Sequence, residues 1–271
     1  MKTIENALKK CLVAVSTGSL VLFFQGCQPM IIAHRGASAV APENTKASFI
    51  LAWQLKAPAA ECDIHLTSDN QIVVIHDRNT KRTGGIDANV NDMNYSEIAL
   101  LDVGSFKDVK YTGQQIPLLA DIVETMPADR KLLIEIKCGK DVLPYLEWII
   151  SKSGKRSRIV VIGFNIDVVT EAKKLMPDIP AYWLVMTEKD KTTDKWILHG
   201  PELIAAAKER HLDGIDVHWA GLSKKFVQKA HKAGLKVYTW TVDDISVARK
   251  VKKMGVDGIT SNKPDLIMKN I

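Results

Sequence analysis

The feature that most constrains the fold is a regular alternation of short β-branched or apolar runs with longer amphipathic stretches. From residue 30 onward, the runs mostly start 21 to 33 residues apart, which leaves room for one helix between neighbours. This alternation is typical of βα units around a parallel sheet. Eight runs qualify as strands, and eight strands close a TIM, or (β/α)8, barrel. The runs cover residues 30–35, 60–66, 131–137, 158–164, 181–186, 214–219, 236–242 and 257–262.

The stretches between these runs predict seven helices, and one gap is longer than the rest. The helices are expected at residues 43–56, 117–125, 141–151, 167–175, 201–209, 224–233 and 245–254. The long gap separates the second and third runs. It holds an extra strand-like segment at residues 71–77 and a Gly-, Asn- and Asp-rich stretch at 79–115. We predict that this gap forms a short excursion after the second strand, above the barrel face, and not a second domain.

The first 26 residues predict a targeting signal. A basic start at residues 1–10 precedes an uncharged and mostly apolar stretch at 11–24, which is the layout of a secretory signal peptide. The apolar stretch is too short for a membrane span, which needs about 20 residues. A small residue, Gly26, directly precedes Cys27. This ending resembles a bacterial lipoprotein signal, in which Cys27 receives the lipid and becomes the mature N-terminus.

The N-terminal signal sets the expected location and the domain count. We expect secretion across the bacterial inner membrane and a lipid anchor on Cys27, facing the periplasm or the cell surface. Phe24 and Gln25 depart from the usual lipoprotein pattern, so an ordinary signal peptide cut near Gly26 is the alternative. Removing residues 1–26 leaves 245 residues, close to the roughly 250 of one such barrel. Residues 27–271 are therefore predicted to form a single domain.

Charge and cysteine content narrow the expected partners. The chain carries 37 Lys and Arg against 31 Asp and Glu, a formal charge of +6, but the basic residues are spread along the sequence. This distribution argues against a nucleic-acid-binding protein. The four cysteines are too scattered for a disulfide scaffold or a paired-cysteine zinc site. We expect a small-molecule substrate, and contact with a membrane only through the lipid anchor.

Acidic residues lie on two predicted strands near their carboxyl ends, where such barrels build their active sites. Glu61 and Asp63 are two apart, so they face the same side of the second run, and Glu135 lies on the third. Three carboxylates in one place repel one another, and one divalent cation would relieve the repulsion. An all-oxygen set favours Mg²⁺ or Ca²⁺ over zinc. Salt bridges to Arg35 and Lys137 are the structural alternative.

Two histidines and two cationic side chains add chemistry to this acidic group. His34 and Arg35 end the first run, His76 lies in the extra segment, and Lys137 ends the third run. A reaction in which one oxygen loses a proton while another gains one needs a base and an acid, and two histidines can fill both roles. Arg35 and Lys137 would place positive charge around phosphate oxygens. The combination fits a metal-assisted phosphodiesterase.

Six separated segments, in the same order along the chain, are similar to those of one enzyme family. They are AHRGASAVAPENTKASF at 33–49, ECDIHLTSDNQIVVIHD at 61–77, IPLLADIV at 116–123, LLIEIK at 132–137, VYTWTVDD at 237–244 and GVDGITSNKPD at 255–265. They resemble the glycerophosphodiester phosphodiesterases, whose fold is the barrel predicted above. The resemblance implies hydrolysis of a glycerophosphodiester to glycerol 3-phosphate and an alcohol, assisted by one divalent cation.

The resemblance also implies roles for single residues. It makes His34 and His76 the general acid and base, without indicating which acts first, and Arg35 and Lys137 contacts to the phosphate. The three carboxylates named above would be the metal ligands. In that family, a neighbouring glycerol hydroxyl is thought to attack phosphorus first, giving a cyclic phosphate that water then opens.

Five further residues carry weaker expectations. Phe164 and Trp240 resemble the family's aromatic pocket lining, with barrel packing as the alternative. His65 lies two residues after a predicted metal ligand and could support the metal site. Glu43 and Asn44 are expected to cap the first helix and brace the catalytic loop.

Two other functions stay open at this point. The same chemistry could act on lysophospholipids or phosphoinositides, although the short excursion and the absence of a long apolar loop favour soluble substrates. A catalytically silent surface binding protein on the same barrel is the other alternative. That alternative predicts lost catalytic residues, and none is lost in this sequence.

Overall fold

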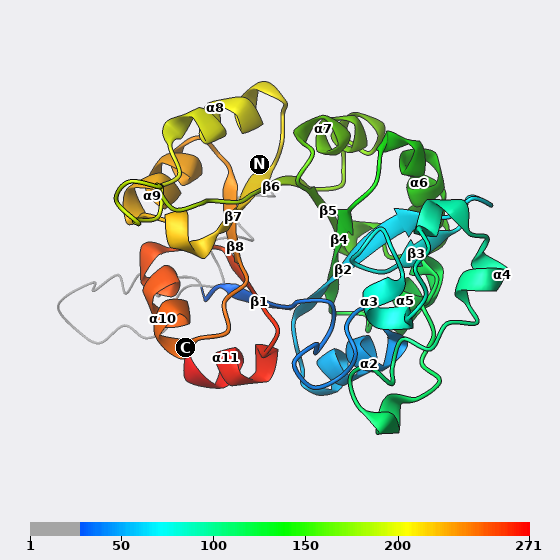
Figure 1. The fold of residues 1–271 in the computed structure, drawn as a ribbon. Helices are drawn as coiled ribbons and strands as arrows, with labels where there is room; N and C mark the ends of the chain where they lie inside the picture. The colour runs from blue at the N-terminus through cyan, green and yellow to red at the C-terminus, as the bar shows by residue number, and fades with distance from the viewer. Residues whose placement is uncertain (1–27) are drawn as a thin grey trace, which may run out of the picture.

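A closed ring of eight parallel strands forms the centre of the molecule, with helices around its outside (Figure 1). The computed structural model describes residues 28–271, so the predicted signal peptide at 1–26 and the predicted lipidation site Cys27 lie outside the described residues. Pairing of the first strand with both the second and the last closes the ring. The predicted TIM barrel is therefore confirmed.

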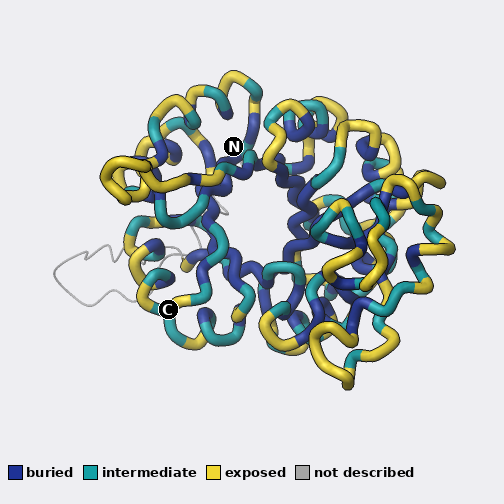
Figure 2. The backbone as a smooth tube through the Cα atoms, in the orientation of Figure 1, coloured by how far each residue is buried: buried dark blue, intermediate teal, exposed yellow. Residues whose placement is uncertain are grey.

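The strands of the ring agree with the predicted runs to within about one residue at their starts. They are β1 (Met30–Ala33), β2 (Ala59–Leu66), β4 (Lys131–Ile136), β5 (Ile159–Gly163), β6 (Ala181–Val185), β7 (Gly214–His218), β8 (Lys236–Trp240) and β9 (Gly258–Ser261). Ile, Val and Leu dominate these runs because a parallel strand in a barrel is buried on both faces. Figure 2 shows this ring as a nearly continuous band of buried backbone, while exposed positions lie on the outer helices and loops.

The outer helices follow the strands in turn, as expected for βα units. They are α2 (Lys46–Gln54), α5 (Leu119–Thr125), α6 (Leu143–Lys152), α7 (Ile166–Leu175), α8 (Pro201–Glu209), α9 (Lys224–Lys232), α10 (Ile245–Met254) and α11 (Pro264–Asn270). The last of these was not predicted; it begins with Pro264 at its first position, where the missing N–H has no cost. None of the helices within residues 28–271 has the length and apolar character of a membrane span.

The first helix begins later than predicted. Thr45 is its N-cap, and the Thr45 hydroxyl accepts a hydrogen bond from the Ser48 backbone N–H. Asn44 has a left-handed backbone with φ of 59°, so the helix cannot extend back through it. The expectation that Glu43 and Asn44 cap this helix is therefore wrong, and both side chains are free to reach the site.

The excursion after β2 lies on one side of the ring, where Figure 1 colours it cyan to green. Its strand β3 (Ile72–Val74) pairs antiparallel with the end of β2, and two short helices follow, α3 (Lys81–Gly84) and α4 (Tyr95–Ile98). The chain also contains the 3₁₀ turns η1 (Val90–Asp92), η2 (Val109–Tyr111), η3 (Lys140–Val142), η4 (Arg156–Arg158) and η5 (Trp219–Gly221). The excursion has a small core of its own, formed by Val73, Ile75, Val90, Ile98, Val103 and Ile116.

Apolar side chains fill part of the barrel interior and leave the carboxyl end for polar groups. Tyr182 and Tyr238 meet edge to face with ring centroids 4.9 Å apart, beside Ile32 and Leu133. A Cβ atom at Gly258 would lie 2.8 Å from the Tyr238 ring, so glycine makes room for this aromatic pair. This packed layer of side chains holds the strands in place, and the site lies toward their carboxyl ends.

Candidate active site

Three carboxylates meet inside the barrel, as the sequence predicts. Glu61 and Asp63 on β2 and Glu135 on β4 are all buried, and one carboxylate oxygen of each lies within 4.8 Å of the others. The strand register places Asp63 directly beside Glu135. Residues that pair across neighbouring parallel strands face the same side of the sheet, and so do residues two apart on one strand. The three carboxylates therefore converge.

The electrostatics of this group fit a divalent cation. Burial, reinforced by the neighbouring carboxylates, raises the pKa of Glu61 well above its usual value and that of Glu135 to about 7. Burial would also raise the pKa of Asp63, but Arg35 and Lys137 outweigh it and hold that pKa below the usual value. The buried Oε1 of Glu61 and Oδ1 of Asp63 have no hydrogen-bond partner among the described residues. Unpartnered carboxylate oxygens are suitable ligands for Mg²⁺ or Ca²⁺.

Two cationic side chains border the carboxylates. The Arg35 guanidinium lies between Asp63, with Nε 3.2 Å from Oδ2, and Glu43, to which Nη1 donates at 2.9 Å. Lys137 donates from Nζ to Oε1 of Glu135 at 2.8 Å. The salt bridges predicted as the structural alternative are thus present. They do not balance three ionised carboxylates, because there are only two cations and Arg35 is shared with Glu43.

The contacts of His76 fix its tautomer. Nδ1 lies 2.6 Å from Oδ1 of Asp77, and a carboxylate only accepts, so Nδ1 carries the hydrogen. Nε2 is then the acceptor, and Lys137 Nζ donates to it at 3.1 Å. Asp77 directly follows His76 in the sequence, so this partner could have been found from the His-Asp pair alone.

His34 has the same tautomer through different residues. Its Nδ1 lies 2.7 Å from Oδ1 of Asn262, whose amide Nδ2 donates to Asp243 at 2.7 Å, and this second bond sets which way the amide faces. Burial and then Arg35 lower the pKa of His34 to about 4, so the imidazole is neutral at pH 7. Its Nε2 lies 3.9 Å from Glu61, on the carboxylate side of the site.

Arg82 of the excursion connects Asp77, beside His76, to Glu43, beside Arg35. This role of Arg82 is not predicted from the sequence. Its guanidinium donates from Nε to Asp77 at 2.7 Å and from Nη2 to Glu43 at 2.7 Å. Asp77 orients His76, and Glu43 holds Arg35. The excursion is therefore part of the site, and no spacing rule relates Arg82 to either partner.

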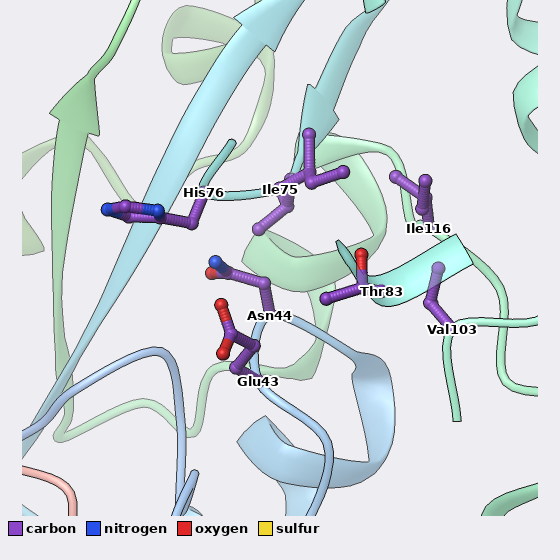
Figure 3. A pocket seen from close by; sticks show the side chains of 8 residues that line it. Glu43, Asn44, Ile75, His76, Thr83, Val103 and Ile116 are labelled. Atoms are coloured by element: carbon purple, nitrogen blue, oxygen red, sulfur yellow. The ribbon is translucent and has the colours of Figure 1, made fainter. Parts of the chain in front are cut away.

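Asn44 does not cap the first helix, but it braces the loop after β1 as expected, since its backbone N–H donates to the Arg35 carbonyl oxygen at 3.0 Å. It is buried, its Nδ2 donates to Oδ2 of Asp63 at 2.8 Å, and its Oδ1 accepts from the Asp63 backbone N–H at 3.3 Å. Figure 3 shows Asn44 and Glu43, from the loop after β1, beside His76, with Val103 and Ile116 of the excursion farther away. Asn44 thus orients one of the carboxylates directly.

A cavity of about 230 Å³ opens beside these groups and brings the predicted residues together. His34, Arg35, Glu61, His76, Glu135, Lys137, Phe164 and Trp240 all line it. Phe164 and Trp240 meet edge to face with centroids 5.4 Å apart, and Lys137 Nζ lies 5.7 Å from the Phe164 ring centre. His65 is not in its lining; its Nε2 lies 3.1 Å from the His76 carbonyl oxygen and supports that backbone.

Known proteins match this chain over nearly its whole described length. Residues 34–266 match the model of the glycerophosphoryl diester phosphodiesterase family. A glycerophosphodiester phosphodiesterase of Caldanaerobacter subterraneus is 31% identical over 245 residues, which cover 88% of this chain and 96% of the relative. A lysophospholipase D of Mus musculus is 36% identical over 156 residues, covering 55% of this chain and 49% of its own.

One solved structure extends the similarity to three dimensions. An Oleispira antarctica phosphodiesterase in complex with the product sn-glycerol-3-phosphate superimposes with a TM-score of 0.81 at 27% identity. The match covers 90% of this chain and 96% of that one. The whole barrel, and not an isolated motif, is therefore shared.

Substitutions of Asn44 test its role in the site. Asn44→Gly removes both hydrogen bonds to buried Asp63, and we expect it to lower the free energy of unfolding by about 1–3 kcal/mol. Asn44→Ala should cost about 1 kcal/mol more, because alanine also resists the left-handed backbone. Urea denaturation of both variants measures this. Equal stability of the alanine variant and the wild type would contradict the assignment.

Proposed function

This chain belongs to the glycerophosphoryl diester phosphodiesterase family and is a glycerophosphodiester phosphodiesterase, and from that premise we propose a metal-assisted hydrolysis to glycerol 3-phosphate and an alcohol by a two-histidine acid and base pair. The observation that carries the proposal is one cavity lined by both histidines, both cationic side chains and two of the three buried carboxylates. The third carboxylate, Asp63, lies within 4.8 Å of the other two.

The residues suited to hold the cation are Glu61, Asp63 and Glu135. A bound Mg²⁺ or Ca²⁺ would supply positive charge that polarises a phosphate oxygen. Arg35 and Lys137 lie next to these ligands and add charge-assisted hydrogen bonds to the phosphate. The chain thereby gathers positive charge where the phosphorane-like transition state becomes most negative.

The histidines supply the proton transfers. Each carries its hydrogen on Nδ1, so Nε2 is the atom that exchanges a proton with the substrate. In the first step, one neutral Nε2 takes the proton of the attacking glycerol hydroxyl, while the other histidine, which enters as an imidazolium with a second proton on Nε2, gives that proton to the oxygen of the departing alcohol. Water then opens the resulting cyclic phosphate to glycerol 3-phosphate, with the roles of the two histidines reversed. Asp77 stabilises the imidazolium form of His76 during this exchange. Lys137 releases His76 Nε2 when it turns to the phosphate.

Lysophospholipids are a second candidate substrate, and one observation favours them. Met186, Trp196, Ile197 and Leu198, in the segment between β6 and α8, are each at least 40% exposed, and Met186 also lines the cavity. Met186 thus places an exposed apolar side chain at the cavity, although the excursion itself is short. An acyl chain leaving the cavity could contact it.

We further propose secretion and lipid anchoring through Cys27, on the sequence of residues 1–27 alone. Mass spectrometry of the protein from bacterial membranes should find Cys27 as a lipid-modified N-terminus. Cys27→Ala should release the protein from the membrane fraction. An unmodified Cys27 inside a soluble mature chain would instead indicate an ordinary signal peptide.

Replacing one histidine tests the catalytic assignment. His76→Asn should lower turnover by about 10²-fold or more, because asparagine cannot exchange a proton, while circular dichroism stays unchanged. His211→Asn is the matched control, since His211 is exposed and has a left-handed backbone that asparagine tolerates. Release of glycerol 3-phosphate, or of lysophosphatidic acid from lysophospholipids, measures activity. Equal turnover in both variants would refute the role of His76.

Metal binding can be measured without turnover. After treatment with a chelator, Mg²⁺ or Ca²⁺ at 100 times its Kd should stabilise the wild type by about 2.7 kcal/mol and restore activity. Glu61→Gln should abolish the stabilisation, while Glu209→Gln, at an exposed position on α8, should keep it. Glu61→Gln should be no less stable than the wild type in chelator, because burial and the neighbouring carboxylates already disfavour the ionised form of Glu61. If neither ion changes the stability of the wild type, the proposed metal site is excluded.

A further inference from the structure

One more acidic residue lines the cavity, and neither the proton transfers nor the metal ligands use it. Asp216 on β7 is 1% exposed, and its Oδ1 has no hydrogen-bond partner among residues 28–271. Its register neighbours are Leu184 on β6 and Tyr238 on β8. A buried carboxyl group between an aliphatic and an aromatic neighbour is unfavourable unless something pairs with it.

The cationic side chains of the cavity do not pair with Asp216. Arg35 is engaged by Glu43 and Asp63, and Lys137 by Glu135. Burial, with the added repulsion of Glu135, raises the pKa of Asp216 well above its usual value. No salt bridge to Asp216 forms within the described part of the chain. A carboxylate is therefore disfavoured at this position unless a bound ligand brings a positive partner to it.

The walls beside Asp216 suit an organic cation. The Trp240 indole N–H donates to the Asp216 backbone oxygen at 3.2 Å, which fixes this ring against β7. Phe164 meets Trp240 edge to face, and both rings line the cavity. Aromatic faces attract ammonium groups, most strongly where water is excluded, and a carboxylate adds a direct ion pair.

The position of Asp216 in the ring indicates which part of a substrate reaches it. The strand order places β7 four strands from β2 in either direction, so Asp216 lies across the barrel from Glu61 and Asp63. A diester whose phosphate sits by those carboxylates can extend one substituent toward β7. The glycerol half is neutral in every glycerophosphodiester, so only the departing alcohol can bring the positive charge.

We propose that Asp216, Trp240 and Phe164 form a subsite for an ammonium group on the departing alcohol, so that the enzyme prefers glycerophosphodiesters of amino alcohols to those of neutral alcohols. This inference rests on the proposed function and deepens it. Thr260, whose Oγ1 is buried without a partner in the same cavity, offers the alcohol a polar contact as well.

The test compares kcat/KM for two substrates and two variants. The wild type should hydrolyse glycerophosphocholine or glycerophosphoethanolamine about tenfold more efficiently than glycerophosphoglycerol, and in Asp216→Asn this ratio should fall toward one. Glu209→Gln, away from the cavity, should keep the wild-type ratio. A ratio that is the same in Asp216→Asn and wild type overturns the subsite. If the wild type cleaves no glycerophosphodiester, the proposed function itself fails.

Inhibition gives a second measurement that does not depend on the folding of the variant. Choline should inhibit the wild type competitively at about a tenfold lower concentration than its neutral isostere, in which carbon replaces nitrogen. Equal inhibition of the wild type by the two alcohols would overturn the proposal. Where Asp216→Asn folds, its preference for choline should be reduced to what the two aromatic rings supply, and an undiminished preference would also overturn the proposal.

Discussion

The repulsion among Glu61, Asp63 and Glu135 is the constraint on which the rest of the site depends. Each carboxylate is buried, and their pKa values separate because only Asp63 has enough positive charge beside it. Arg35 and Lys137 offset part of the charge and leave the remainder for a cation. In the proposed function the same two side chains also contact the phosphate, so they would both balance the carboxylates and bind the substrate.

The excursion extends this arrangement beyond the barrel. The strands alone place the carboxylates and Lys137, but His76 lies past the end of β3 and is oriented by Asp77. Arg82 then joins Asp77 to Glu43, the partner of Arg35. Folding of the excursion against the loop after β1 thus positions His76 and Arg35 together. An insertion that the sequence predicts to be a short excursion is a structural part of the candidate active site.

Features that depend on local periodicity can be predicted from the sequence. Features that depend on packing between distant elements cannot. The eight strands, and the convergence of Glu61, Asp63 and Glu135, follow from alternation along strands and from the common end of a parallel barrel. Asn44, Asp243 and Asn262 owe their roles to contacts between segments far apart in the chain, and no spacing rule contains those contacts. Helix α11, which begins at Pro264 after the last strand, is absent from the predicted helices. The predictions for residues 1–27 stay predictions.

Asp63 and Asp216 show how one barrel can give the same side chain two opposite environments. Both are buried on inward positions of parallel strands, yet the pKa of Asp63 is lowered and that of Asp216 is raised, although burial alone would raise both. The difference is that Arg35 and Lys137 reach Asp63 and no described cation pairs with Asp216. Because β2 and β7 lie on opposite sides of the ring, the cavity is polarised across its width. A phosphodiester with a cationic alcohol has the opposite polarity, with negative charge at phosphorus and positive charge at the far end of the alcohol. The charge patterns of the cavity and of such a substrate are complementary. Residues on β7 and β8 can therefore distinguish substrates by their departing alcohol, whereas the glycerol half is the same in all of them.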